Sequence, residues 1–293
     1  MSHINDGSTK SKVVRIPADP EVVQRYAKID SGEIDFFSFS ELIPIIPLMM
    51  SQESGYMFSK TCEATLNSGE IEKLEKEHFD VYIVETFDVC GMMLAHLIKP
   101  LAVIMSSTTI IAGDDYDELG VPAALSYNPA ELTRTLDIHS FTSRLWNLYA
   151  DYVTKLQLSG ARRQVDNVFM QKYGADYPSL KEISANVAYV FTNSEPLIDF
   201  ATPTLSRVID IGGLGAKEPQ ELDEYWQSVM TRREKVVLIS FGSVAKSFLL
   251  APNVKQALLT VASSFPSVTF VRKYEKKDEF ALGPAAKIDN LVL

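Results

Sequence analysis

The chain has 293 residues, enough for one large or two ordinary domains, and its 46% hydrophobic and 23% charged residues are typical of globular proteins. A formal net charge of -10 argues against nucleic acid or an anionic membrane surface as the main partner. Two cysteines, Cys62 and Cys90, are too few for a disulfide framework, and no run of 18 apolar residues encodes a spanning helix.

The N-terminal quarter has a broken pattern. Residues 1–12 are polar and lack the basic-then-apolar pattern of a signal peptide, so the sequence by itself predicts a soluble intracellular chain. Residues 13–17 predict a short strand closed by proline. Residues 19–77 are mostly helical in spacing, but two prolines predict a buried loop or kinked turn at residues 42–50.

A strand–helix–strand unit follows. Residues 79–85 and 100–105 predict strands, and residues 90–97 predict a helix with an apolar face. Such a unit indicates a parallel sheet with a right-handed crossover. Ser106 and Ser107 then lie at the carboxyl end of the second strand, where α/β sheets place ligands.

A loop and a long helix come next. Acidic residues, glycine and proline predict a loop over residues 113–129. Ser140 or Thr142 can cap a helix whose apolar residues are spaced at three and four, and Gly160 is expected to interrupt it. The aromatic part, residues 145–152, is suited to line a pocket for a lipophilic molecule, with ordinary core as the alternative.

Strands resume at residues 187–193 and 208–213, and the polar stretch at residues 215–234 predicts a linker with a short helix. The alternation continues beyond the linker with a strand, a helix and a strand, at residues 235–239, 253–265 and 268–272. Alternation on both sides of the linker predicts an α/β fold with two doubly wound domains, of which the second is incomplete.

The strand at residues 235–239, expected to be buried on both faces, leads into a turn that contains Gly242 and Ser243. Glycine lets the backbone approach a ligand, hydroxyls donate hydrogen bonds and free amides point outward, so this turn can cradle a phosphate. An ordinary strand-to-helix turn is the alternative, because one glycine is far from a full phosphate-loop motif.

Several short segments in this order and spacing resemble the UDP-glucuronosyltransferases, a family of UDP-dependent glycosyltransferases. They are residues 80–85 followed by Cys90 and Gly91, residues 191–194, residues 211–214 and residues 237–243. The resemblance covers residues 13–293 and implies a GT-B fold of two facing Rossmann-like domains. It assigns residues 13–214 to an N-terminal acceptor-binding domain and residues 235–293 to a partial C-terminal UDP-sugar-binding domain.

The resemblance also implies segments that this sequence lacks at both ends: a signal peptide, the strand before a catalytic histidine, further donor-sugar contacts and a C-terminal membrane anchor. We therefore expect a truncated chain. The family implies the lumenal side of the endoplasmic reticulum membrane, whereas the chain as written predicts a soluble protein. His3, in Ser2-His3-Ile4-Asn5, is similar to the family's tetrapeptide around the histidine, and a disordered N-terminal histidine is the alternative.

In this family an acceptor hydroxyl attacks the anomeric carbon of the sugar while a histidine takes its proton and a carboxylate orients the imidazole. Glu85 stands where the family has the aspartate, so we expect Glu85 to orient His3, with Asp88 as a weaker substitute. The resemblance makes Cys90 a packing residue. His96 is expected to be an ordinary helical histidine.

The resemblance also implies the ligand contacts. Gly242 and Ser243 are expected to contact the UDP phosphates. Arg272 is a candidate for the donor phosphate or sugar, with a surface arginine as the alternative, and Ser106 and Ser107 are assigned to the acceptor side. Neither a metal nor a cofactor is expected, because the UDP-sugar is a donor substrate.

The sequence thus predicts inverting, base-assisted transfer of a glucuronosyl or other hexosyl group from UDP-glucuronic acid or a UDP-hexose to a small lipophilic acceptor hydroxyl. The alternative is an inactive fragment that serves as an acceptor-binding or partner-binding module, paired as a homo- or hetero-oligomer with family members. As written, the chain is expected to show no useful turnover. An NAD-linked dehydrogenase is a remote third reading, because no G-x-G-x-x-G follows any strand.

Overall fold

The computed structural model describes all residues except 1–9, 34–44, 110–113, 131–136, 138 and 244. It divides into two compact units. Unit 1 contains the described residues of Met1–Val23 and Ile43–Ala216, and unit 2 contains those of Gln24–Leu42 and Lys217–Leu293. The division after Ala216 falls inside the predicted linker. The predicted domain boundaries, and the facing arrangement of the two domains, stay predictions.

Unit 1 is built on a four-stranded sheet whose strands lie in the order β1-β2-β3-β4. All three strand pairs are parallel. The strands are β1 (Val81–Glu85), β2 (Ala102–Ser107), β3 (Tyr189–Thr192) and β4 (Val208–Asp210). Helix α4 (Val89–Ile98) connects β1 to β2, so the predicted strand–helix–strand unit and the α/β fold class are confirmed.

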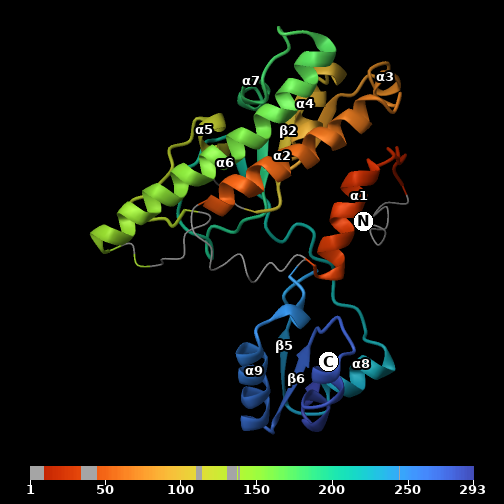
Figure 1. The fold of residues 1–293 in the computed structure, drawn as a ribbon, viewed down its shortest axis with the longest axis vertical. Coiled ribbons are helices and arrows are strands. Elements are labelled where there is room, and N and C mark those ends of the chain that lie inside the picture. The colour runs from red at the N-terminus through yellow and green to blue at the C-terminus, as the bar shows by residue number, and fades with distance from the viewer. Residues whose placement is uncertain (1–9, 34–44, 110–113, 131–136, 138, 244) are drawn as a thin grey trace. The chain divides into compact units, whose positions relative to one another are not determined.

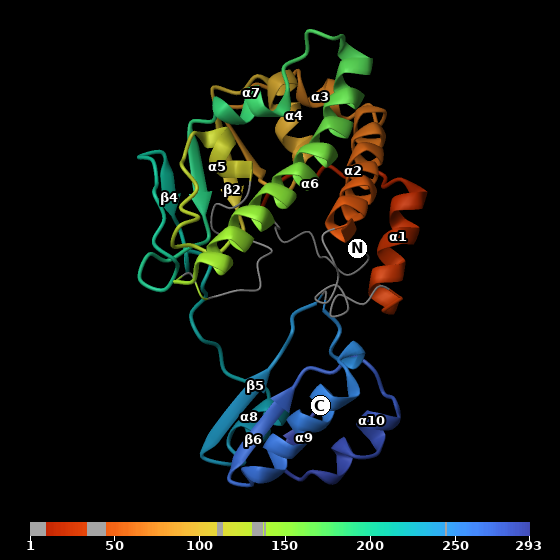
Figure 2. The same cartoon turned by 60° about the vertical axis from the view of Figure 1, so that its left-hand side comes forward.

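Two long helices lie side by side over unit 1, α2 (Ile45–Leu66) and α6 (Phe141–Tyr173), as Figures 1 and 2 show. Gly55 of α2 permits this close approach, because a Cβ atom there would lie 2.8 Å from the Cα atom of Ala161 on α6. The shorter helices that complete the order are α1 (Pro20–Ser31), α3 (Ile71–Leu74), α5 (Asp114–Leu119) and α7 (Leu180–Ala185).

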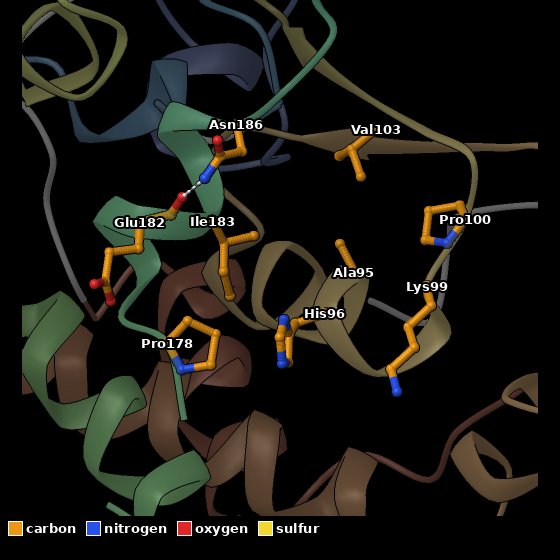
Figure 3. Close-up of a pocket in the computed structure, with 9 residues that line it drawn as sticks. All are labelled: Ala95, His96, Lys99, Pro100, Val103, Pro178, Glu182, Ile183 and Asn186. Carbon is orange, nitrogen blue, oxygen red and sulfur yellow. Dashed lines mark hydrogen bonds between the residues drawn. The ribbon is translucent and has the colours of Figure 1, made fainter. Parts of the chain in front are cut away.

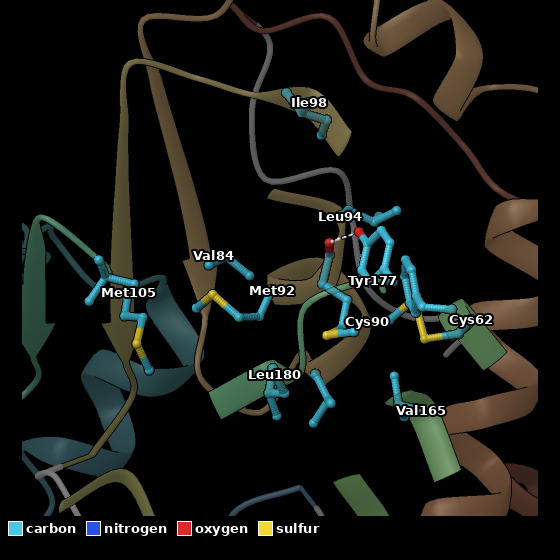
Figure 4. Packing of buried hydrophobic residues seen from close by; sticks show 14 of the residues in the cluster. Cys62, Val84, Cys90, Met92, Leu94, Ile98, Met105, Val165, Tyr177 and Leu180 are labelled. Carbon is cyan, nitrogen blue, oxygen red and sulfur yellow. Dashed lines mark hydrogen bonds between the residues drawn. A yellow bond between two sulfur atoms is a disulfide. The ribbon is translucent and has the colours of Figure 1, made fainter. Parts of the chain in front are cut away.

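The core of unit 1 lies between the sheet, α4 and the two long helices (Figure 4). Met93 of α4 and the α6 residues Val165 and Phe169 have no exposed surface. Helix α4 is apolar around most of its circumference, which is typical of a helix packed on both sides. Burial of this apolar surface is the main force that holds α2, α4 and α6 to the sheet.

Unit 2 has a three-stranded parallel sheet in the order β5-β6-β7. Its elements are α8 (Glu224–Met230), β5 (Lys235–Ile239), η2 (Ser247–Leu249), α9 (Pro252–Ser264), β6 (Val268–Arg272), α10 (Glu279–Leu282), η3 (Ala285–Lys287) and β7 (Leu291–Val292). The prediction that β5 is buried on both faces is wrong, because β5 lies at the sheet edge and Leu238 is 71% exposed. The buried strand is the central one, β6.

Four local predictions also differ from the structure. Residues 13–17 pair with no strand among the residues described, and the predicted loop at residues 113–129 contains the short helix α5. Pro47 is the third residue of α2, where a helix has no backbone N–H bond to lose, so the part of residues 42–50 that is described, from Ile45 on, is helical. Helix α6 continues through Gly160, because packing on α2 outweighs a penalty of about 1 kcal/mol for glycine.

No helix in the described parts of the chain is both long and apolar enough to cross a bilayer.

Candidate active site

The strands of unit 1 end together at one edge of the sheet, which we call the carboxyl edge. Because the strands are parallel, the residues at their ends are neighbours: Glu85 pairs with Ser106, Ser107 with Thr192, and Thr192 with Asp210. Parallel α/β sheets place ligands at this edge. The structure therefore brings three of the predicted site residues, Glu85, Ser106 and Ser107, into adjacent positions.

The carboxylate of Glu85 is held by the chain immediately around it. The backbone N–H of Phe87 donates to Oε2 over 2.7 Å, and the hydroxyls of Thr86 and Thr108 lie 3.4 Å and 3.5 Å from Oε1. A carboxylate can accept about four hydrogen bonds, so this arrangement leaves acceptor capacity on Glu85. Glu85 thus has a defined orientation and can still accept a bond from an imidazole N–H.

Asp88, the substitute candidate, serves a different purpose. Its side chain caps α4, because Oδ1 accepts a 2.9 Å hydrogen bond from the N–H of Gly91. Gly91 has no room for a side chain, since a Cβ atom would lie 2.4 Å from Oδ2 of Asp88. This geometry favours Glu85 over Asp88 for the orienting role.

The two cysteines form one disulfide, between Cys62 at the end of α2 and Cys90 in the first turn of α4, with Cα atoms 5.4 Å apart (Figure 4). The expectation that Cys90 is only a packing residue is therefore wrong. Both residues are buried, so the spacing in sequence gave no sign that they meet. The bridge fixes the start of the helix that follows Glu85.

Sequence reasoning missed a hydroxyl network at the end of β3 and β4. The hydroxyl of Thr192 donates to Oδ1 of Asp210 over 2.7 Å, and Ser194 donates to the same oxygen atom. Thr192 and Ser194 are buried. The signal available in the sequence was the acidic residue that ends the apolar run Val208-Ile209, which suits a strand-end carboxylate. Ser107 is likewise buried, at 3% exposure, whereas Ser106 is half-buried.

The turn after β5 places Gly242 and Ser243 on the surface of unit 2. Gly242 has a φ of +81°, a left-handed conformation that glycine adopts without strain. Arg272, at the end of β6, is only 1% exposed, and its guanidinium binds Ser247 instead of facing solvent. Burial lowers the pKa of Arg272 from its ordinary value. Its predicted donor contact stays a prediction, and His3 lies outside the described residues.

A cavity of about 360 Å³ lies at the other end of the sheet, near the start of β2 (Figure 3). It is lined by residues of α4, α7 and the segments beside them: Ala95, His96, Lys99, Pro100, Val103, Pro178, Glu182, Ile183 and Asn186. The ring of His96 meets that of Tyr177 edge-on, with centroids 5.1 Å apart. His96 is therefore a packed helical histidine, as expected, and not part of the carboxyl edge.

A second cavity, of about 350 Å³, lies beside the start of α6 and is mostly apolar. Buried Asn147 shapes it by donating to the carbonyls of Leu125 and Asn128 and accepting from the N–H of Ala130. The predicted aromatic helix contributes Leu145 and Leu148 to this cavity. No cluster of three or more potential metal ligands occurs among the described residues.

Comparisons with known proteins agree with one another. The profile of the family described as "UDP-glucoronosyl and UDP-glucosyl transferase" matches residues 3–290. The protein named "Putative UDP-glucuronosyltransferase ugt-48" of Caenorhabditis elegans is 29% identical over 244 residues, which are 80% of this chain and 45% of that protein. Human "UDP-glucuronosyltransferase 3A1" is 28% identical over 195 residues, 64% of this chain and 36% of that protein.

The chain spans about half the length of the first curated relatives it matches. One solved structure, titled "Crystal Structure Analysis of the Glycotransferase of kitacinnamycin", aligns with a TM-score of 0.49 and 12% identity over 83% of this chain and 54% of that chain.

Proposed function

The chain belongs to the UDP-glucoronosyl and UDP-glucosyl transferase family, and on that premise we propose that it transfers a glucuronosyl group from UDP-glucuronic acid to the hydroxyl of a small lipophilic acceptor. The names of the curated relatives favour glucuronic acid over another hexosyl group. The observation that carries the proposal in this chain is the oriented carboxylate of Glu85 at the carboxyl edge.

Glu85 is proposed to act on a histidine base, for which His3 is the candidate. A carboxylate bound to one imidazole N–H leaves the other nitrogen as the acceptor and stabilises the positive charge that forms. The 2.7 Å bond from the N–H of Phe87 keeps Oε2 in place while Oε1 stays available. Ser106, next to Glu85 across the sheet, is proposed to contact the acceptor together with Ser107.

The proposed reaction is a single displacement. The acceptor oxygen forms a bond to the anomeric carbon, and the bond from that carbon to the β-phosphate oxygen breaks, so UDP leaves with the electron pair. The acceptor proton passes to the histidine. Attack opposite the leaving group inverts the configuration at the anomeric carbon.

Gly242 and Ser243 are proposed to hold the UDP phosphates. The amides of Ser243 and Ala245 donate no hydrogen bond to any other described residue, and both residues are accessible to some degree. Amides and hydroxyls that are fixed in place stabilise the charge that develops on a leaving phosphate. The apolar cavity beside Leu145 and Leu148 is proposed to accept the lipophilic part of the acceptor.

The disulfide between Cys62 and Cys90 supports an oxidising compartment such as the lumen of the endoplasmic reticulum. This proposal replaces the intracellular reading that composition suggested. Peptide mapping of protein from its native source, without reducing agent, should recover the linked peptides. Recovery of both cysteines as free thiols would contradict it.

Turnover tests the proposed function directly. Purified chain is mixed with UDP-glucuronic acid and a panel of phenols, and UDP release is followed together with the glycoside product by mass spectrometry. We expect product of inverted configuration and its loss in His3→Ala, with His139→Ala as the matched control. Absence of both turnover and UDP binding would exclude the proposal for this chain.

A further inference from the structure

Three cationic side chains hold the carbonyl side of the turn after β5. We call this turn the β5 loop, meaning the described residues between Ser240 and Leu249. Lys273 Nζ donates to the carbonyl of Gly242 over 2.7 Å, and Lys255 Nζ donates to the carbonyl of Phe248 over 2.5 Å. Arg272 binds Ser247 between them. The loop is thus anchored at its beginning and at its end.

Arg272 is the most deeply buried of the three. Its Nε and Nη2 atoms donate to Oγ of Ser247 over 3.1 Å and 2.9 Å, and Nη2 also lies 3.4 Å from the Ser247 carbonyl. Ser247 has no exposed surface, and Arg272 has 1%. A buried guanidinium carries a large desolvation cost, which is accepted only where its hydrogen bonds and neighbours compensate it.

The compensation comes from two aromatic rings. The guanidinium carbon of Arg272 lies 5.1 Å from the ring centroid of Tyr274 and 5.5 Å from that of Phe280, both within cation–π range. Lys255 Nζ lies 5.7 Å and 5.5 Å from the same two centroids. Tyr274 is itself fixed by a 2.8 Å hydrogen bond to Asp278. The rings hold Arg272 in a rigid position from which it reaches Ser247 and no solvent.

These contacts separate the two sides of the loop. Carbonyl oxygens carry partial negative charge and would repel a phosphate, and the cations turn the carbonyls of Gly242, Ser247 and Phe248 toward the protein. The amides of Ser243 and Ala245 are left for a ligand. Concavities lined by such amides bind anions.

We propose that Arg272 is a positioning residue that fixes the β5 loop through Ser247, so that the loop presents amides and not carbonyls to the UDP phosphates. Arg272 does not touch the donor in this mechanism. The inference rests on the proposed function only in naming UDP as the ligand, because the anchoring of the loop by Arg272 is a property of unit 2 without ligand.

A double-mutant cycle separates positioning from direct contact. The cycle uses Arg272→Met, which keeps the length and the aromatic packing, Ser247→Ala, and both together, with UDP affinity measured by calorimetry. If Arg272 acts through Ser247, each single variant weakens UDP binding by roughly tenfold and the double variant is no weaker than either. If Arg272 touches the phosphates directly, Ser247→Ala leaves UDP affinity within about twofold of wild type, and the proposal fails.

Hydrogen exchange of the full chain without UDP provides the second measurement. We expect the amides of the β5 loop to exchange roughly tenfold faster in Arg272→Met and in Ser247→Ala, while β6 amides keep their wild-type rates. Arg272→Lys, which can still donate to Ser247, should restore slow exchange in part. Faster exchange throughout unit 2, or unchanged exchange in the loop, would overturn the proposal.

The two measurements also separate this inference from the proposed function. If wild-type chain binds no UDP but Arg272→Met loosens only the β5 loop, the anchoring role stands and the proposed function fails. If wild-type chain binds UDP and neither variant changes the loop or the affinity, the proposed function stands and the positioning role fails.

Discussion

The two units fix their functional groups in opposite ways. At the carboxyl edge of unit 1 the functional group is a side chain, Glu85, and the backbone N–H of Phe87 holds it. In the β5 loop of unit 2 the functional groups are backbone amides, and the side chains of Lys255, Arg272 and Lys273 hold the backbone from behind.

The difference follows from the surroundings. Glu85 ends a strand that has a neighbour, so the chain beside it is already fixed by the ladder to β2 and by the cap of α4. The β5 loop follows an edge strand and has little packing of its own. Long-range side-chain bonds therefore replace local packing there. This comparison predicts local, single-residue effects in unit 1 and coupled effects in unit 2.

The largest expected effect is at Glu85. Glu85→Gln keeps an oxygen for the Phe87 N–H but removes the charge that stabilises an imidazolium, so kcat/KM should fall by roughly 10³–10⁴ while stability changes little. Steady-state kinetics with a saturating phenol measures this.

Asp88→Ala is the matched control, three residues away. It removes the cap of α4 and should lower the free energy of unfolding by about 1 kcal/mol with kcat/KM within threefold of wild type. A loss of turnover at Asp88 with none at Glu85 would reverse the assignment of the carboxylate.

The second effect concerns the disulfide, which is confined to unit 1. Its removal in Cys62→Ala/Cys90→Ala should destabilise unit 1 by roughly 3 kcal/mol, because the bridge closes a loop between residues 28 apart in sequence. The two tryptophans of the chain, Trp146 in unit 1 and Trp226 in unit 2, allow separate readings by fluorescence.

Denaturant unfolding in a Trp226→Phe background reports unit 1, and in a Trp146→Phe background it reports unit 2. The midpoint should fall in the first background alone. An equal fall in both would show that the two units unfold together and that the contrast between them does not extend to stability.

The smallest effect is at Gly242. Gly242→Ala places a Cβ atom on a residue with a φ of +81° and no atom within 4 Å, so it adds backbone strain of roughly 1–2 kcal/mol without a clash. We expect UDP affinity to fall by up to about tenfold as the loop relaxes. Gly213→Ala imposes the same strain in unit 1, at a φ of +78° with open space, and should leave UDP affinity unchanged.

Much of the fold was predictable because it depends on neighbours in the sequence. The apolar runs that become β1, β2, β3 and β6 are typical of strands in a parallel sheet, and each ends where a polar residue or a turn begins. Ser140, one of two proposed caps, precedes α6 and accepts from the N–H of Ser143. The placement of Glu85 beside Ser106 also followed from strand ends alone.

The sequence by itself therefore determined the α/β class, the strand–helix–strand unit and the residues at the carboxyl edge, since periodicity and strand ends are local properties. Only the tertiary structure decided that Cys62 meets Cys90, that β5 is an edge strand, and that Arg272 is buried against Ser247. Each of these depends on contacts between segments far apart in the chain. Such contacts are set by the packing of whole elements, which no local pattern encodes.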